Sequence, residues 1–327
     1  MQVAVDQPES SVADANFQTG TRGLIAIDKV GNQVLFLDPL TYETTLTLDG
    51  FAPRVHEVSV SPGRKMAYVP IYGDGIHGKN PRPGHLVAVF DLEQRRHAGD
   101  FSTYPYLAPH GLRWGHRGQL YCVCENSGAV LELDAKRGTI VSVIEIGSDK
   151  AHRIEITPDG YKLYSENEED TFASVIDLRE GKRIKRIPAP NGLAGIGMSP
   201  DGRTIVLVDA KLPEILVVRT DIDEVACTIP LVGHDRSAQI ARFSPDGRYL
   251  VVTSFDAPLA TIFDSTLRTQ RLLHLGEGPM NMAFHADGRT VVIANQNGGS
   301  LSICDLESAE VMRTVPAGIG IEALSFF

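Results

Sequence analysis

A short turn phrase recurs along this chain at a nearly constant interval, and it constrains the fold more than any other feature. The phrase is Pro-Asp-Gly or a close variant of it, and its glycines, which are 42, 42, 45 and 41 residues apart, are Gly118, Gly160, Gly202, Gly247 and Gly288. Proline presets φ, aspartate caps the turn, and glycine takes the positive φ that the turn requires. A period of this length predicts one supersecondary unit repeated along the chain.

Each unit is predicted to contain four β-strands. A short apolar strand precedes the turn, and a β-branched run such as residues 204–208 follows it. A third strand ends in aspartate, as at residues 301–306, and a fourth closes the unit, as at residues 310–315. Helical periodicity is nowhere sustained. Four strands in about 40 to 45 residues is the period of a propeller blade.

The two ends of the chain supply complementary parts of one blade. Residues 23–27 have the pattern of a second strand without a first, and residues 322–327 have that of a first strand without a second. Joining them removes both sheet edges. We therefore predict an all-β, seven-bladed β-propeller of four-stranded antiparallel blades over residues 20–327, closed by pairing of the C-terminal strand into the first blade. Residues 1–19 are predicted to form a flexible N-terminal arm.

Composition excludes some partners. The net charge of −10 and the pI near 5.5 argue against nucleic acid. No window holds the ~20 apolar residues of a membrane helix. All four cysteines lie in apolar strand patterns, which predicts free buried thiols and a cytoplasmic location; a removed signal peptide would instead indicate the periplasm. These residues are Cys122, Cys124, Cys227 and Cys304, and the first two are predicted to pack in the core.

The repeat also resembles a known group. Ser-Pro-Asp-Gly-Arg followed by Thr-Ile-Val-Leu-Val or Tyr-Leu-Val-Val-Thr is similar to the YVTN-type repeat of the lactonase-like and haem-nitrite-reductase-like seven-bladed propellers. The resemblance implies the fold over residues ~20–327. It implies no single function, because that superfamily contains lactonases, lyases, redox enzymes and non-catalytic surface proteins. The sequence has no C-x-x-C-H haem site and no repeated Trp-Asp pair.

Polar residues recur at one position of the blade, six residues before the turn proline. The residues at this position are His56, His110, His152, Ala194, Gln239 and Met280, with Glu322 in the closing strand. The position begins the innermost strand, and equivalent positions of a rotationally repeated fold converge on its axis. Imidazole, carboxylate and amide ligands suit Mn, Fe, Zn or Cu. We therefore predict a divalent metal site made of His56, His110, His152, Gln239 and Glu322, similar to that of oligogalacturonate lyases.

Two considerations weigh against this metal site. Polar residues at a channel rim can simply bind water or satisfy one another. Strand alternation also places the ring position on the same side as apolar Val58 and Val60, so strand twist is expected to turn it toward the axis.

The second blade carries a long insertion, residues 72–85, which is predicted to act as a lid or substrate clamp. Lys79 and Arg82 are expected to hold a substrate carboxylate, and His77 or His85 to transfer protons. The alternative is a solvated loop without a function.

Further polar residues are expected on the same face. The ends of the second strands carry Glu125, Glu166, Asn167, Asp209, Ser254 and Asn295. These residues are predicted to line the mouth of the site, as Glu125 and Asn295 would, or to orient the imidazoles. His234 and Arg236 are expected to add contacts from the same rim. Further along the inner strands, one shared position holds Arg113, Glu155 and Arg242, for which we predict a structural ion-pair network.

These features predict a metal-dependent enzyme (a lyase, an isomerase or a lactone hydrolase) that acts on a small anionic organic substrate at the top of the central channel. The predicted catalytic residues are Glu322, His77, His85 and His234, and the predicted substrate-binding residues are Lys79, Arg82, Arg236, Glu125 and Asn295. One alternative is a metal-free hydrolase that uses the same histidines and glutamate. Another is a non-catalytic propeller that binds a protein or ligand.

Overall fold

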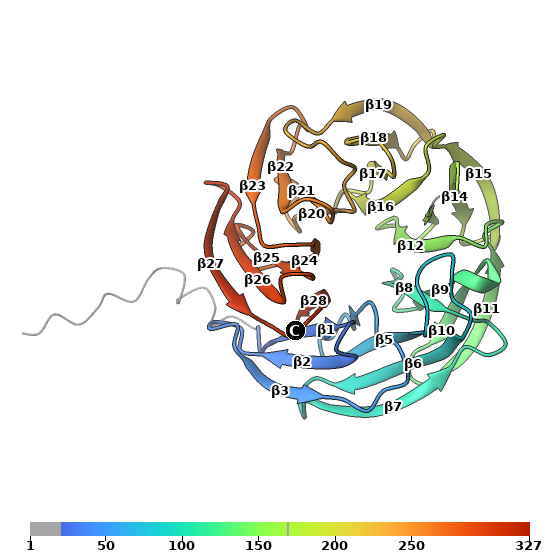
Figure 1. Ribbon diagram of the computed structural model, residues 1–327. Coiled ribbons are helices and arrows are strands. Elements are labelled where there is room, and N and C mark those ends of the chain that lie inside the picture. Colours follow the sequence, from blue (N-terminus) through green and yellow to red (C-terminus); the bar gives the residue numbers. More distant parts are fainter. Residues whose placement is uncertain (1–20, 169) are drawn as a thin grey trace, which may run out of the picture.

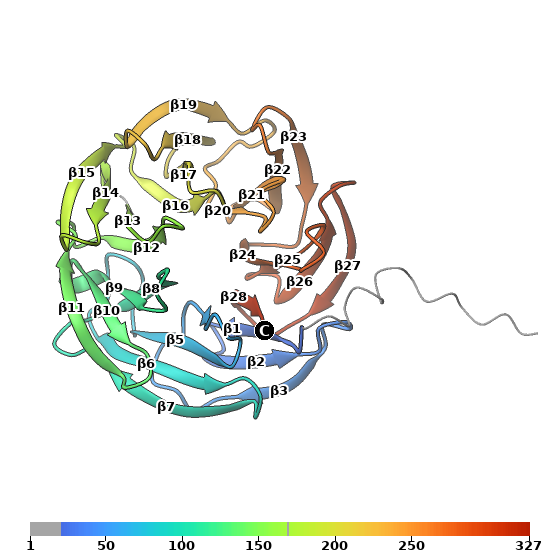
Figure 2. The same cartoon turned by 180° about the vertical axis from the view of Figure 1, so that it is seen from behind.

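Seven sheets are arranged as blades around a central axis in the computed structural model, which describes residues 21–168 and 170–327 (Figures 1 and 2). Each sheet has four antiparallel strands, so the predicted all-β, seven-bladed propeller is confirmed. The arm predicted for residues 1–19 lies outside the described residues. The single helical element in the described ranges is η1 (Glu125–Ser127), and none of the helices described there could cross a membrane.

The strands of the first four blades are given from the axis outward. The first blade contains β28 (Ile321–Phe326), β1 (Leu24–Asp28), β2 (Gln33–Leu37) and β3 (Thr44–Leu48). The second contains β4 (Ser59–Val60), β5 (Met66–Gly73), β6 (Pro83–Asp91) and β7 (Arg96–Ser102). The third contains β8 (Pro109–Trp114), β9 (Leu120–Cys124), β10 (Ala129–Asp134) and β11 (Thr139–Glu145). The fourth contains β12 (Ala151–Ile156), β13 (Lys162–Asn167), β14 (Phe172–Asp177) and β15 (Lys182–Pro188).

The last three blades repeat the same order. The fifth contains β16 (Leu193–Met198), β17 (Thr204–Asp209), β18 (Glu214–Arg219) and β19 (Glu224–Pro230). The sixth contains β20 (Ile240–Phe243), β21 (Tyr249–Ser254), β22 (Leu259–Asp264) and β23 (Gln270–His274). The seventh contains β24 (Pro279–Phe284), β25 (Thr290–Asn295), β26 (Ser300–Asp305) and β27 (Glu310–Pro316).

The recurring turn has the conformation that its residues predict. Gly202, between β16 and β17, has φ of +69°, which a residue with a Cβ seldom adopts. The Asp201 carboxylate caps this turn, since it accepts hydrogen bonds from the Ser199 hydroxyl (2.6 Å) and the Arg203 backbone N–H (3.0 Å).

The ring closes where β28 pairs with β1, for example Leu324 with Ala26. Phe327 continues this segment and packs edge-on against Phe36, with ring centroids 5.9 Å apart. The hydrophobic core lies between neighbouring blades: one buried cluster joins Leu24 of the first blade to Val292 of the seventh. The closing strand therefore completes both a sheet and the packing between two blades.

Two sequence expectations need correction. Cys227 lies on the outer strand β19 and is exposed, because the outermost strand of a blade has one face in solvent, whereas Cys122, Cys124 and Cys304 are buried as predicted. The insertion in the second blade was predicted as a loop over residues 72–85. The loop itself spans only residues 74–82, because β5 continues to Gly73 and β6 begins at Pro83.

The closing segment offers a matched pair of isoleucines with which to test closure. Ile321 is 0% exposed in the cluster between the first and seventh blades, whereas Ile319 is 66% exposed. Ile321→Ala is expected to lower the free energy of unfolding by about 2–5 kcal/mol through lost burial and a cavity. Ile319→Ala should change it by less than about 0.5 kcal/mol. Urea unfolding of both variants measures this, and equal effects would contradict the described closure.

Candidate metal centre

Most of the innermost strands carry one extra residue at the ring position, although β20 pairs without a shift. In β12 the pairing with β13 shifts between Ala151 and Arg153, so His152 has no partner opposite it. In β28 the shift leaves Glu322 unpaired in the same way. Strands β8, β16 and β24 shift at the equivalent place. A β-bulge re-aims the side chain of its extra residue, so a bulge, and not strand twist alone, takes the ring position away from the apolar face.

His56 reaches the axis through a similar irregularity. Val55 pairs with Ile71, and Ser59 pairs with Tyr68. The segment that contains His56 advances four residues between these two pairs, from 55 to 59, whereas the partner strand advances three, from 68 to 71. The segment of His56 therefore holds one extra residue. Three blades thus direct one histidine each toward the same place.

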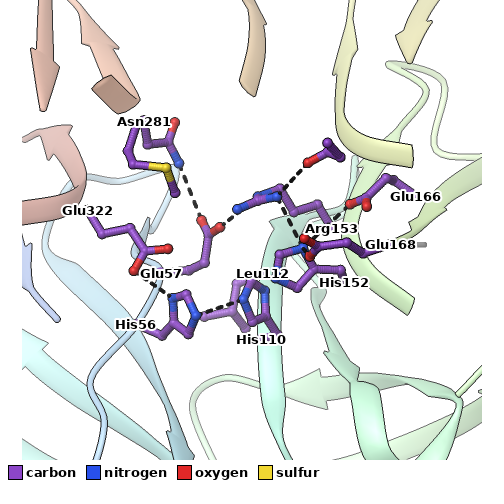
Figure 3. A network of polar contacts seen from close by, with 12 residues as sticks. His56, Glu57, His110, Leu112, His152, Arg153, Glu166, Glu168, Asn281 and Glu322 are labelled. Atoms are coloured by element: carbon purple, nitrogen blue, oxygen red, sulfur yellow. Dashed lines mark hydrogen bonds and ion pairs between the residues drawn. The ribbon is translucent and has the colours of Figure 1, made fainter. Parts of the chain in front are cut away.

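The three imidazoles meet as the sequence predicts (Figure 3). Nε2 of His56 and Nε2 of His110 are 3.0 Å apart, and the ring centroids of His110 and His152 are 3.8 Å apart. One nitrogen from each ring lies within 4.8 Å of the other two, and the residues are only 3%, 0% and 5% exposed. Two nitrogens bound to one ion at ~2.1 Å, with an angle of roughly 90–110°, are about 3.0–3.4 Å apart. The spacing of His56 and His110 therefore fits a shared ion.

Glu322 contacts the other nitrogen of His56. Its Oε2 is 3.3 Å from His56 Nδ1 and 2.9 Å from Lys29 Nζ. The carboxylate thus lies across the ring from the nitrogen that faces His110. A carboxylate in this position orients an imidazole and increases its basicity, as outer partners of metal-bound histidines do.

A second group of acidic side chains adjoins the imidazoles. His152 Nδ1 is 2.7 Å from Glu168 Oε2 and 3.7 Å from Glu166 Oε2. His77 Nδ1 is 3.2 Å from Glu125 Oε2 and 3.6 Å from Glu168 Oε2. Two sets of three ligand atoms within 4.8 Å arise here, namely His77 with Glu125 and His152, and His152 with Glu166 and Glu168.

The insertion of the second blade is fastened to this acidic group. The Glu125 carboxylate accepts hydrogen bonds from the Tyr72 hydroxyl (2.9 Å) and the Gly78 backbone N–H (3.2 Å). The Asn80 side-chain amide donates to the Tyr72 carbonyl (2.8 Å). These bonds hold His77 against the cluster. Lys79 and Glu125 line one cavity of about 640 Å³.

Two other predicted residues of the insertion lie apart from the cluster. His85 is exposed and its Nδ1 contacts Ser102 Oγ at 3.2 Å. The Arg82 side chain is 78% exposed and pairs with Asp74. Both border a separate cavity of about 300 Å³. The reason is that β6 begins at Pro83 and carries His85 away from the axis.

The predicted rim contacts are also engaged elsewhere. His234 Nε2 lies 2.8 Å from Thr261 Oγ1, and the Asn295 side-chain amide donates to Ser300 Oγ (3.1 Å) and Ser302 Oγ (2.9 Å) of its own blade. The structure does not bring these two to the imidazoles.

Gln239 and Arg236 lie before β20. Gln239 is half-buried and its backbone N–H donates to the Thr253 carbonyl (2.7 Å), while Arg236 is exposed. Their predicted roles as metal ligand and substrate contact stay predictions.

Burial controls the charge of the imidazoles. Desolvation, together with nearby cations such as Arg153 and Lys29, holds the pKa of His56, His110 and His152 well below its usual range. The three rings are therefore neutral at physiological pH. A neutral imidazole has the free lone pair that a metal requires.

In the acidic group, the pKa values of Glu166 and His77 are raised, not lowered. Burial, reinforced by the charge of Glu168, raises the pKa of Glu166 to about 8. Burial lowers the pKa of His77, but the hydrogen bond to Glu125 and the charge of Glu168 outweigh it and raise the pKa to about 9.

A buried ion pair between Arg153 and Glu57 lies beside the imidazoles. Arg153 Nε donates to Glu57 Oε1 (3.1 Å), and its Nη1 lies 3.1 Å from His152 Nδ1. Burial would raise the pKa of Glu57, but Arg153 and other cations lower it to about 2.

The predicted ion-pair network is confirmed. Glu155 lies between Arg113 (2.9 Å) and Arg242 (2.5 Å), and all three line a cavity of about 270 Å³.

No role was predicted for Lys29 or Glu168, whereas Glu125 was expected to bind substrate, line the mouth or orient the imidazoles. Each of these three residues directly follows the second strand of its blade, namely β1, β13 and β9. The ends of the second strands lie on the face where the innermost strands begin.

No family model and no curated protein matches the chain. Among solved structures, the chain is similar to a chain of Kuenenia stuttgartiensis hydrazine synthase, with 17% identity and a TM-score of 0.68 over 87% of this chain and 92% of that chain. At this identity the similarity shows the propeller fold alone.

The Arg113–Glu155–Arg242 network allows a test of buried charge. Glu155→Gln leaves two arginines facing each other and should lower the free energy of unfolding at pH 7 by about 3 kcal/mol. Burial would raise the pKa of Glu155, but the two arginines lower it, so its contribution is present above pH 4.5 and is lost as the pH falls through the lowered value. The difference between variant and wild type should therefore narrow in acid. Denaturant unfolding from pH 3 to 7 measures it, with exposed Glu310→Gln as control; a constant difference would contradict the network.

Proposed function

We propose that this propeller is an enzyme that uses a divalent cation held by His56, His110 and His152. The observation that carries the proposal is the convergence of one nitrogen from each ring within 4.8 Å. Nδ1 of His110 is buried and makes no hydrogen bond, whereas Nδ1 of His56 contacts Glu322 at 3.3 Å. Buried polar atoms are normally satisfied, so the idle nitrogen of His110 supports a ligand in this cluster.

The local charge supports a cation. The carboxylates around the imidazoles are Glu57, Glu125, Glu166, Glu168 and Glu322. The cations that form ion pairs with them within residues 21–168 and 170–327 are Lys29, Arg153 and His77. Buried charges without compensation are costly. Because burial raises the pKa of Glu166 to about 8, this carboxyl carries a proton at neutral pH, and the other four carboxylates exceed the three cations by one charge. A divalent ion that also displaces the proton of Glu166 would balance the set. Imidazole with carboxylate suits Mn, Fe, Zn or Cu.

A bound cation would polarise a carboxylate or carbonyl of the substrate. His77 and Glu125 form a hydrogen-bonded pair beside the imidazoles and are our candidates for proton transfer. Glu322 and Lys29 would orient His56.

The cavity beside Glu125 suggests where a substrate binds. Two lysines, Lys79 and Lys150, line it together with two carboxylates, Glu125 and Asp149. The lysines are our candidates to bind a small organic anion. The chemistry that we propose for such an anion is that of a lyase, an isomerase or a lactone hydrolase.

Metal content tests the proposal directly. Purified protein should contain bound transition metal by inductively coupled plasma mass spectrometry. His110→Ala should lower the affinity for that metal at least ~10–100-fold, because a ligand in a rigid set is lost. His274→Ala, an exposed histidine on β23, is the matched control and should leave the metal content unchanged. Wild-type protein that takes up no metal would overturn the proposal.

Turnover tests the enzymatic part. The metal-loaded protein is incubated with a panel of uronates, hydroxy acids and lactones, and the products are followed by NMR. We expect conversion that a chelator abolishes and that Lys79→Gln weakens through KM, since Lys79 would contribute binding of the anion. Conversion that persists in chelator would favour the metal-free hydrolase. A tightly bound partner without turnover would favour a binding platform.

A further inference from the structure

We propose that the chain binds a second divalent cation between Glu166, Glu168 and His152, next to the three-histidine site. This inference deepens the proposed function and rests on it. His152 borders both positions, because it belongs to the three-histidine set and also to each acidic set. The two acidic sets contain neither His56 nor His110.

The contacts of the acidic group are those of ligands without their ion. Glu166 is 0% exposed, and neither of its carboxylate oxygens makes a hydrogen bond with another side chain. Oε2 of Glu168 lies between two imidazoles, 2.7 Å from His152 Nδ1 and 3.6 Å from His77 Nδ1. An ionised carboxylate in such a place is costly unless a cation meets it.

The ligand types define the ion. Two or three carboxylates with one or two imidazoles are harder than the three-histidine set and suit Mn²⁺ or Zn²⁺ better than a cation that prefers sulfur. The alternative is a proton on Glu166, which would relieve the repulsion without any ion.

Stoichiometry distinguishes these possibilities. The full chain is stripped with a chelator, equilibrated with Mn²⁺ alone or Zn²⁺ alone, desalted and analysed by inductively coupled plasma mass spectrometry. We expect the wild type to bind close to two ions and the double variant Glu166→Gln/Glu168→Gln to keep about one. The His110→Ala variant should lose the ion of the three-histidine site and keep the ion of the acidic site. The His152→Ala variant should bind both ions more weakly. Glu310→Gln, an exposed carboxylate on β27, should keep two.

Each outcome bears on a different claim. One ion in the wild type, lost in His110→Ala but kept in Glu166→Gln/Glu168→Gln, overturns the second site and leaves the proposed function standing. One ion lost equally in both variants indicates a single mixed site and also overturns the inference. No ion in the wild type overturns both proposals. Circular dichroism shows whether each variant is folded; if the double variant is not, Glu168→Gln alone replaces it, because the Glu168 side chain is 18% exposed.

Discussion

The candidate centre depends on an extra residue at the start of the innermost strands. A regular strand would place the ring position on the apolar face, where Val58 and Val60 lie. The bulge at His152 and its counterparts in other blades turn that one side chain toward the axis while the rest of the strand keeps its packing. The propeller can therefore keep a hydrophobic core between its blades and still gather polar groups at its centre.

Burying several charged groups at one place costs free energy unless their charges are compensated. Burial keeps the imidazoles neutral and makes them good ligands, but the same burial makes the surrounding carboxylates costly. Arg153 and Lys29 compensate some of that charge through Glu57 and Glu322. The charge that they leave, together with the unsatisfied oxygens of Glu166, is the physical reason to expect a metal.

Much of the fold could be predicted from the sequence, because each repeat is marked by a turn whose residues determine the local backbone conformation. Closure could be predicted because residues 23–27 lack a preceding first strand and residues 322–327 lack a following second strand. The convergence of His56, His110 and His152 followed from rotational repetition alone. The contacts of His85, His234 and Asn295 could not be predicted, because they depend on how far a strand extends and on which neighbouring hydroxyl is nearest. Lys29 and Glu168 were missed because they lie one residue beyond the strands used to align the blades.

The proposed metal centre stands or falls with one ion shared by the three imidazoles at the axis. X-ray diffraction from crystals of the purified protein, with anomalous data collected on both sides of the absorption edge of the metal present, would locate that ion. We expect an anomalous peak about 2.0–2.2 Å from one nitrogen of each of His56, His110 and His152. Imidazoles that hydrogen-bond only to one another and to water, with no anomalous peak between them, would contradict it.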